Sequence, residues 1–152
     1  AHGRAFFEAS AEACRALSRR GVLLSRYDDQ IPPSLPPGVR AFSYVPHSAL
    51  LPRCAAIVHH GGVGTVSQAL KAGIPQLVRP TNFDQPDNAV RIKRMGVGSY
   101  LNAADYDARS AARELGALLD SSAIKRRCGE VAAQMQNNTA LADTCALLEE
   151  LA

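Results

Sequence analysis

The sequence predicts an α/β fold of the Rossmann-like, doubly wound type, in which helices cover both faces of a mainly parallel sheet. Three observations favour this fold class. Short buried apolar runs alternate with helical patterns, a glycine-rich turn at 59–65 joins a strand to a helix, and the chain from Asp107 onward reads as a helical C-terminal tail. With 152 residues, 47% of them hydrophobic, the chain can bury one core. Residues 1–152 are therefore expected to form a single domain.

The first predicted element is a helix over residues 4–20. Its apolar residues Phe6, Ala9, Ala13 and Leu17 share one face, and Gly21 is expected to end it in a left-handed conformation. The next elements, in chain order, are a buried strand at 22–25, a proline-rich loop at 31–38, a strand at 39–43 and a short helix at about 48–53.

The middle of the chain repeats a strand, turn and helix pattern. A strand at 55–58 leads through the glycine turn into a helix at 66–72 that stops at Gly73. Pro75 precedes a strand at 76–78, and a loop follows at 79–85. Pro86 suits the first turn of a helix that runs to Met95, Gly96 stops it, and a strand follows near 99–101.

Three apolar stripes in the tail are interpreted as packing faces of helices. They consist of Ala111, Leu115, Leu118 and Leu119; of Ile124, Cys128, Val131 and Met135; and of Leu141, Cys145, Leu148 and Leu151.

The order of these elements is unusual because a helix comes first. A parallel sheet of this type normally begins with a strand that lies near its middle. We therefore expect the first strand to be missing and the chain to be a fragment of a longer protein. The resulting gap or exposed edge would favour self-association.

Composition excludes several classes of function. The net charge is only +3, there is no Trp and 5% of residues are aromatic, which argues against a nucleic-acid partner. The four cysteines form no C-x-x-C pair, which favours a reducing, cytoplasmic location. No window approaches the roughly 18 apolar residues of a membrane span, although peripheral attachment stays open.

Polar or glycine-rich loops follow three of the predicted strands, at the edge where open α/β sheets bind ligands. The first holds Tyr44, Val45 and His47, with a ring and a backbone stretch suited to a base. The second is the glycine turn, whose backbone can approach a phosphate at a helix N-terminus. The third, Asn82 to Gln85, offers polar groups for sugar hydroxyls. This order suggests a nucleotide sugar lying across the strand ends.

These motifs resemble the nucleotide-sugar signature of the UDP-glycosyltransferase family. The resemblance covers roughly residues 39–98, with His60-Gly61-Gly62-Val63-Gly64-Thr65 preceded by Tyr44-Val45-Pro46-His47 and followed by Phe83-Asp84-Gln85 and Asn88-Ala89. Bacterial and sterol-type members with His-His-Gly-Gly are the most similar. The resemblance implies a two-domain GT-B enzyme, of which this chain is most of the C-terminal, donor-binding half.

The resemblance also implies roles for individual residues. Tyr44 would stack on uracil, Val45 would offer backbone groups to the base edge, and His47 belongs to the same nucleotide-binding loop. His60, Gly62, Gly64 and Thr65 would donate to the diphosphate, and Asp84 and Gln85 would hold the sugar hydroxyls. Gln68 departs from the pattern, because many members have a glutamate there that grips both ribose hydroxyls.

The implied reaction is displacement at the anomeric carbon, with inversion, no cofactor and no metal. Fixed N–H groups and His60 would stabilise the departing diphosphate. The ligand would be UDP or a UDP-sugar, and the acceptor a lipid, sterol or small natural product. The general base is expected in the missing N-terminal domain, so no catalytic residue is expected in this chain.

Several alternatives remain at this point. His59 and His60 could bind a metal, although adjacent histidines in a tight turn point apart. The D-x-D string at 105–107 occurs in metal-dependent glycosyltransferases, but an aspartate before an amphipathic helix is typical of an N-cap. Tyr44 could be a core residue, and Asp84 could cap a helix. The chain could also be a non-catalytic nucleotide-binding module or part of a GT-B UDP-N-acetylglucosamine epimerase.

Overall fold

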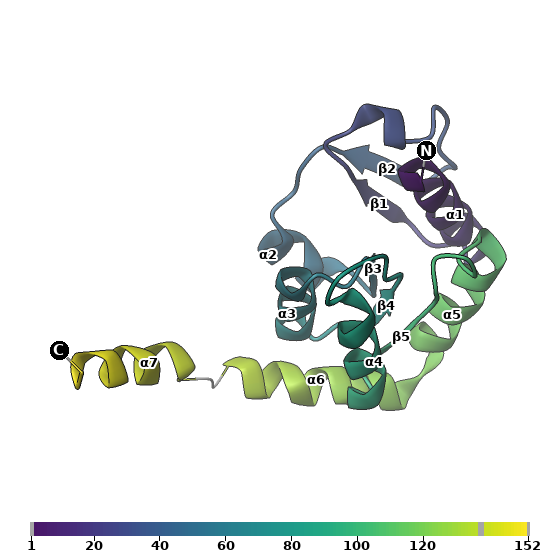
Figure 1. Cartoon of the computed structure of the whole chain (residues 1–152). Helices are drawn as coiled ribbons and strands as arrows, with labels where there is room; N and C mark the ends of the chain where they lie inside the picture. Colours follow the sequence, from purple (N-terminus) through teal and green to yellow (C-terminus); the bar gives the residue numbers. More distant parts are fainter. Residues whose placement is uncertain (1, 137–138, 152) are drawn as a thin grey trace.

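A computed structural model describes residues 2–136 and 139–151 and shows alternating strands and helices followed by a helical tail (Figure 1). The strands are β1 (Gly21–Leu24), β2 (Val39–Phe42), β3 (Ile57–His59), β4 (Gln76–Val78) and β5 (Gly98–Tyr100). The helices are α1 (His2–Ala16), α2 (His47–Leu50), α3 (Val63–Ala72), α4 (Gln85–Met95), α5 (Ala108–Asp120), α6 (Ser122–Gln136) and α7 (Ala140–Glu149), with 3-10 turns η1 (Asp28–Gln30) and η2 (Leu51–Arg53).

Every strand pair in the described residues is parallel, which confirms the predicted sheet type. β1 pairs with β2, and β3, β4 and β5 pair in that order. No pairing joins β1 to β3 in the described ranges, so the sheet is divided into two pieces. In the doubly wound strand order, the place between these two strands is that of the first strand.

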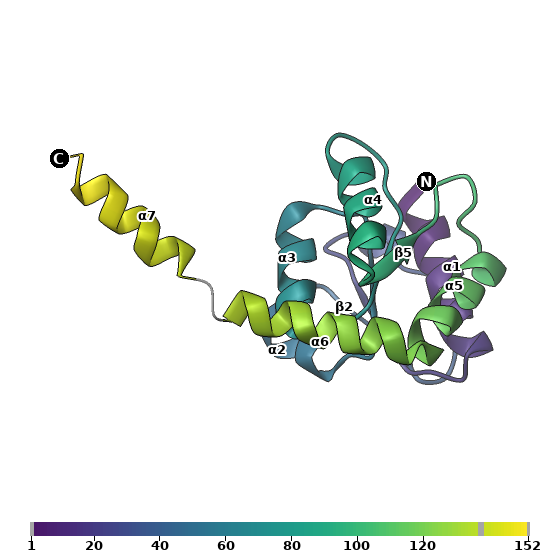
Figure 2. The same cartoon turned by 90° about the horizontal axis from the view of Figure 1, so that it is seen from below.

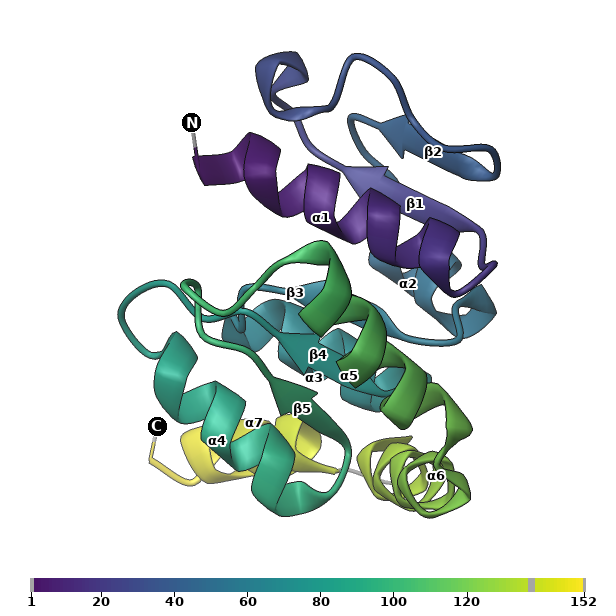
Figure 3. The same cartoon turned by 90° about the vertical axis from the view of Figure 1, so that its right-hand side faces the viewer.

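Helices cover both faces of the three-stranded piece. On one face, Leu77 of β4 packs with Ala13 of α1 and with Leu115 and Leu118 of α5. Figure 3 shows α1 and α5 side by side in front of the strands. On the other face, the neighbouring residue Val78 packs with residues of α4 and α6. Consecutive residues of β4 thus face opposite layers, as the period of a strand requires.

Glycines end two of the helices as predicted. Gly73 and Gly96 take left-handed conformations, with φ of 70° and 72°, at the ends of α3 and α4. The same prediction for Gly21 is wrong. Helix α1 ends at Ala16, Ser18 takes the left-handed conformation with φ 52°, and Gly21 begins β1. Gly21 is a site of close packing instead, since a Cβ there would lie 2.8 Å from Sγ of Cys14.

Other boundaries differ from the prediction by one to three residues, and two of these shifts concern the glycine turn. The strand predicted at 55–58 spans Ile57–His59, which places His59 inside the sheet. The helix predicted from 66 begins at Val63, because Gly62 takes an extended conformation and acts as the N-cap. Gly64 and Thr65 therefore belong to the first turn of α3.

The helical tail divides into a packed part and an unpacked part. Ala111, Leu115 and Leu118 of α5 and Cys128 and Val131 of α6 are buried as predicted. Helix α7 projects away from the strands (Figure 2). It carries the third apolar stripe of the tail, whose described residues are exposed.

The exposed fraction of that stripe is 62% at Leu148 and 85% at Leu151, and Cys145 is also exposed. The side chain of Leu141 lies outside the described part. The stripe was expected to be a packing face, and for its described residues this is wrong within this chain. Among the described helices, none combines the length and apolar character that crossing a bilayer requires.

One buried polar pair joins β3 to β4. His59 is 7% exposed and Gln76 is fully buried. The N–H of Gly61 donates to Nδ1 of His59 at 3.0 Å, which assigns the proton to Nε2, and Nε2 donates to Oε1 of Gln76 at 2.9 Å. Both ring nitrogens are thereby satisfied in the neutral form. Burial lowers the pKa of His59 to about 4, against the opposing effect of its hydrogen bond to Gln76.

We predict that Gly98→Ala destabilises the fold by about 2–3 kcal/mol, because the new Cβ would overlap the backbone oxygen of Gln76 and lie 2.7 Å from Cγ2 of Ile92. Gly129→Ala is the matched control. Gly129 lies inside α6 with nothing within 4 Å of an added Cβ, so alanine there should stabilise the helix by about 0.5–1 kcal/mol. Urea denaturation of both variants checks this, and equal effects would contradict it.

A second prediction concerns pH. The folded-state pKa of His59 lies below its ordinary value of 6.5, so between pH 6.5 and 4 the unfolded chain binds a proton that the folded chain does not. Stability is complete above pH 6.5 and falls as the pH drops, by about 2 kcal/mol at pH 5 from this residue. NMR titration of the His59 ring should show it neutral at pH 5 in the folded chain. A midpoint near 6.5 would refute the assignment.

Candidate functional site

The candidate site lies where the parallel strands end. β2 leads into the loop with Tyr44, β3 into the glycine turn and β4 into the loop with Asp84. Because parallel strands place their carboxyl ends at one edge of a sheet, this topology brings together loops that are far apart in sequence. The three loops are connected in the structure: a shared cavity connects the first with α3, and direct packing connects the second with the third.

The glycine turn is shaped by Gly61. Its φ of +99° favours glycine, and a Cβ there would lie 2.9 Å from Cγ1 of Val78 and 3.2 Å from the backbone oxygen of Gln85. The side chain of Asn88 donates to the oxygen of Gly61 at 2.9 Å. The turn after β3 is therefore packed directly against the loop after β4, and only glycine permits this approach.

The N-terminus of α3 presents free donors to solvent. Thr65 and Val66 donate to the oxygen of Gly62, while the N–H groups of Val63 and Gly64 have no acceptor in the described residues. Such orphan amides, together with the positive end of the helix dipole, form an anion-binding position. The ring of His60 lies beside it, since its Nε2 is 2.7 Å from where a Cβ on Gly62 would be, and a protonated ring nitrogen is a donor.

Gly64 is informative because packing does not require it. It lies in the first turn of α3, and an added Cβ would meet nothing within 4 Å. Alanine at such a position gives a more stable helix. The missing side chain leaves open space beside the free amides, at the point where an anion would approach.

The first loop forms one wall of a cavity of about 390 Å³. Its lining includes four of the predicted nucleotide-binding residues: Tyr44, Val45, His47 and Gln68. Tyr44 is 70% exposed, so it is not a core residue. Gln68 comes from α3, one turn beyond Thr65, so the cavity and the anion-binding position share one helix.

Arg26 also lines this cavity and is missing from the sequence-based set. It follows β1, and the strand-end rule could have identified it had the loop after residue 25 been considered with the others. Its guanidinium supplies the cavity with donors only.

The third loop is held by Gln85. Its Oε1 accepts from the N–H of Thr81 at 2.9 Å, from the hydroxyl of Thr81 at 2.7 Å and from the N–H of Asn82 at 3.1 Å. Asp84 occupies the N-cap position of α4 without a capping hydrogen bond, and its Oδ2 accepts from Asn88 at 2.8 Å. The capping alternative for Asp84 is therefore not realised, and the Oε1 of Gln85 has a structural task.

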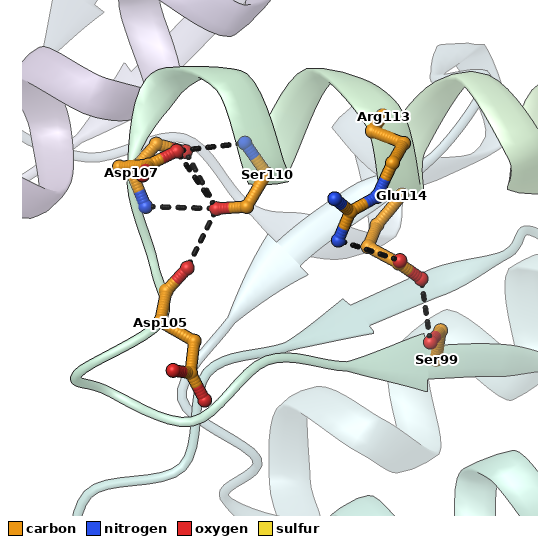
Figure 4. A network of polar contacts seen from close by, with 6 residues as sticks. All are labelled: Ser99, Asp105, Asp107, Ser110, Arg113 and Glu114. Carbon is orange, nitrogen blue, oxygen red and sulfur yellow. Dashed lines mark hydrogen bonds and ion pairs between the residues drawn. The ribbon is translucent and has the colours of Figure 1, made fainter.

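The D-x-D string proves to be a helix start. The carboxylate of Asp107 accepts from the N–H of Ser110 at 2.7 Å, and the hydroxyl of Ser110 accepts from the N–H of Asp107 at 3.0 Å (Figure 4). This capping box at α5 confirms the N-cap interpretation. The hydrogen bond from the backbone of Ser110 lowers the pKa of Asp107.

The adjacent histidines have separate surroundings. Both ring nitrogens of His59 are engaged inside the sheet, whereas His60 is exposed at the start of α3. In the ranges 2–136 and 139–151, no three His, Cys, Asp or Glu side chains gather in a way that could hold a metal ion.

Comparison with known proteins identifies relatives of this arrangement. Residues 23–151 match the family model described as "Erythromycin biosynthesis protein CIII-like, C-terminal domain". The chain is 39% identical over 119 residues to aclacinomycin-T 2-deoxy-L-fucose transferase of Streptomyces galilaeus, an alignment that covers 77% of the chain and 27% of the relative.

Solved structures of glycosyltransferases have the same fold as this chain. Spinosyn forosaminyltransferase SpnP superposes with a TM-score of 0.88 and 27% identity, over 97% of this chain and 38% of that one. Glycosyltransferase VinC in complex with DTDP gives a TM-score of 0.77 and 31% identity, over 88% and 33%. The chain thus spans about a third of the length of these relatives and has the fold of the C-terminal domain of GT-B glycosyltransferases. It belongs to the family of the erythromycin biosynthesis protein CIII-like C-terminal domain.

Proposed function

We propose that the chain is the donor-binding domain of a glycosyltransferase that moves a hexose from a UDP-sugar to an acceptor hydroxyl. The observation that carries this proposal is the N-terminus of α3. Free amides and the open space at Gly64 lie there between a cavity suited to a base and a polar loop suited to a sugar.

The binding mode follows from this order. The diphosphate lies against the amides of Val63 and Gly64, with His60 and the hydroxyl of Thr65 as further donors. The base enters the cavity beside Tyr44 and the backbone of Val45. The sugar extends in the other direction, toward Asp84 and the free amide group of Gln85.

The same groups favour the chemistry. When the bond to the anomeric carbon breaks, negative charge grows on the outer phosphate, and fixed donors stabilise that charge without reorganisation. We propose that these donors neutralise the leaving group in place of a metal ion or cofactor. The general base that activates the acceptor hydroxyl, and the inversion it brings about, are assigned to a domain outside this chain.

The names of the relatives bear on the acceptor. Aclacinomycin-T 2-deoxy-L-fucose transferase and spinosyn forosaminyltransferase are named for natural products, so we propose a small natural product as the acceptor, ahead of a lipid or sterol. These names favour a transferase over an epimerase or a non-catalytic module. The four free cysteines support a cytoplasmic location. Self-association through the open strand edges remains a prediction.

Gln68 bears on the identity of the nucleotide that the chain binds. A carboxylate could accept from both ribose hydroxyls, whereas the amide of Gln68 has one acceptor oxygen. A deoxyribose needs only one such contact. The complex of VinC with DTDP shows that a member of this fold accepts a deoxynucleotide, so dTDP-sugars are a second candidate donor.

The proposed function predicts that the chain binds UDP and that Gly64→Ala weakens this binding by about tenfold or more, because the methyl group fills the space of a phosphate oxygen. The same variant should be slightly more stable, by about 0.5–1 kcal/mol.

His60→Ala should weaken UDP binding about tenfold through loss of a charge-assisted hydrogen bond. Calorimetry with UDP measures both effects, and Gly129→Ala is the control. A folded chain that binds neither UDP nor dTDP would refute the proposal.

A separate prediction tests the ribose contact. Gln68→Glu should raise the affinity for UDP about tenfold, because a carboxylate accepts charge-assisted hydrogen bonds from two hydroxyls. The affinity for dUDP, which lacks only the 2′-hydroxyl, should rise by a smaller factor, because only one contact is then strengthened. A ratio of UDP to dUDP affinity that is the same in both proteins would remove Gln68 from the ribose site.

A further inference from the structure

Phe83 is the most exposed large hydrophobic residue of the described chain. It lies in the loop between β4 and α4, its exposed fraction is 94%, and its φ is +57°. The left-handed conformation is unfavourable for a residue with a bulky side chain, and exposure of a whole aromatic ring to water is unfavourable as well. Glycine would remove both costs, so the stability of this chain does not account for Phe83.

The loop fixes Phe83 from both sides. On its N-terminal side, Thr81 and Asn82 donate to Oε1 of Gln85. On its C-terminal side, Asn88 donates both to Asp84 and to the oxygen of Gly61. These bonds determine the backbone around Phe83 and hence the direction of its Cα–Cβ bond. A strained residue held in this way is typical of a prepared binding position.

The groups beside the ring are those that a sugar requires. Asp84 Oδ1 and Gln85 Nε2 make no hydrogen bond within residues 2–136 and 139–151, which leaves one acceptor and one donor group free. A pyranose combines hydroxyl groups at its rim with an apolar C–H face. An exposed ring next in sequence to two residues with free polar groups complements both parts.

The position relative to the phosphate completes the argument. Gly61 of the glycine turn packs against Gln85, with only 3.2 Å between an added Cβ and the oxygen of Gln85. A group attached to a phosphate at the start of α3 therefore reaches the loop that carries Phe83, whereas the base cavity extends along α3 toward Gln68.

We propose that Phe83 stacks on the apolar face of the donor hexose and so contributes to recognition of the sugar, not of the nucleotide. This inference rests on the proposed function. It explains the exposed ring and the strained backbone of Phe83 by contact with the hexose, instead of with the acceptor or with another protein segment.

The test compares each nucleotide sugar with its own nucleoside diphosphate. Calorimetry on the chain measures the affinity for UDP and UDP-glucose, and for dTDP and dTDP-rhamnose. Phe83→Ala should weaken binding of at least one of the two sugars about three- to tenfold, while the affinity for UDP and dTDP stays within twofold. Phe83→Tyr and Phe83→Trp should retain that sugar's contribution, and Leu148→Ala is the control for loss of an exposed apolar side chain.

Phe83→Gly separates binding from folding. It should lose the sugar contribution as Phe83→Ala does and yet raise the melting temperature, because glycine accepts the left-handed conformation without strain. The inference is overturned if Phe83→Ala weakens UDP and UDP-glucose equally, if it changes neither sugar's affinity, or if neither sugar binds more tightly than its nucleotide. Absence of all nucleotide binding overturns the proposed function and this inference with it.

Discussion

The close approach of the backbone at Gly61 to the loop that follows β4 is the constraint on which the site depends. Contact with Val78 and Gln85 leaves no room for a side chain at this point. The hydrogen bond from Asn88 to Gly61 and the buried ring of His59 beneath the turn hold the same junction from two other directions. Through it, the start of α3 is held against the loop between β4 and α4, as the proposed binding of one ligand by both segments requires.

Residue patterns in the sequence were sufficient for the fold class, the parallel strands and the glycine-capped ends of α3 and α4. Gly73 and Gly96 directly follow helical segments and precede the next strand, so their capping role is a local property that the sequence displays. The capping prediction for Gly21 was wrong because Gly21 packs closely against Cys14, seven residues earlier. No local pattern distinguishes a glycine needed for packing from one that caps a helix. The stripe on α7 shows the related limit: periodicity identifies an apolar face but not what covers it.

The site was predictable in its loops but less so in its individual side chains. The strand-end rule located the three loops, and the D-x-D string was correctly interpreted as an N-cap. The task of Gln85 in holding Thr81 and Asn82 could not be predicted, because a polar residue in a loop can face a ligand or its own backbone. Arg26 could have been predicted by applying the same strand-end rule to the loop that follows β1.

The division of the sheet has a consequence for cooperativity. Within the described part of the chain, no ladder hydrogen bonds cross from β1 to β3, so the β1–β2 pair is coupled to the three-stranded piece mainly by the packing of α1 on α5. Side-chain packing of this kind couples two parts less strongly than a continuous ladder, so we expect amide protons in β1 and β2 to exchange with solvent through openings that leave β4 protected. The loop that carries Tyr44 follows β2 and α3 follows β3, so the proposed base position lies on the less protected unit and the proposed phosphate position on the more protected one.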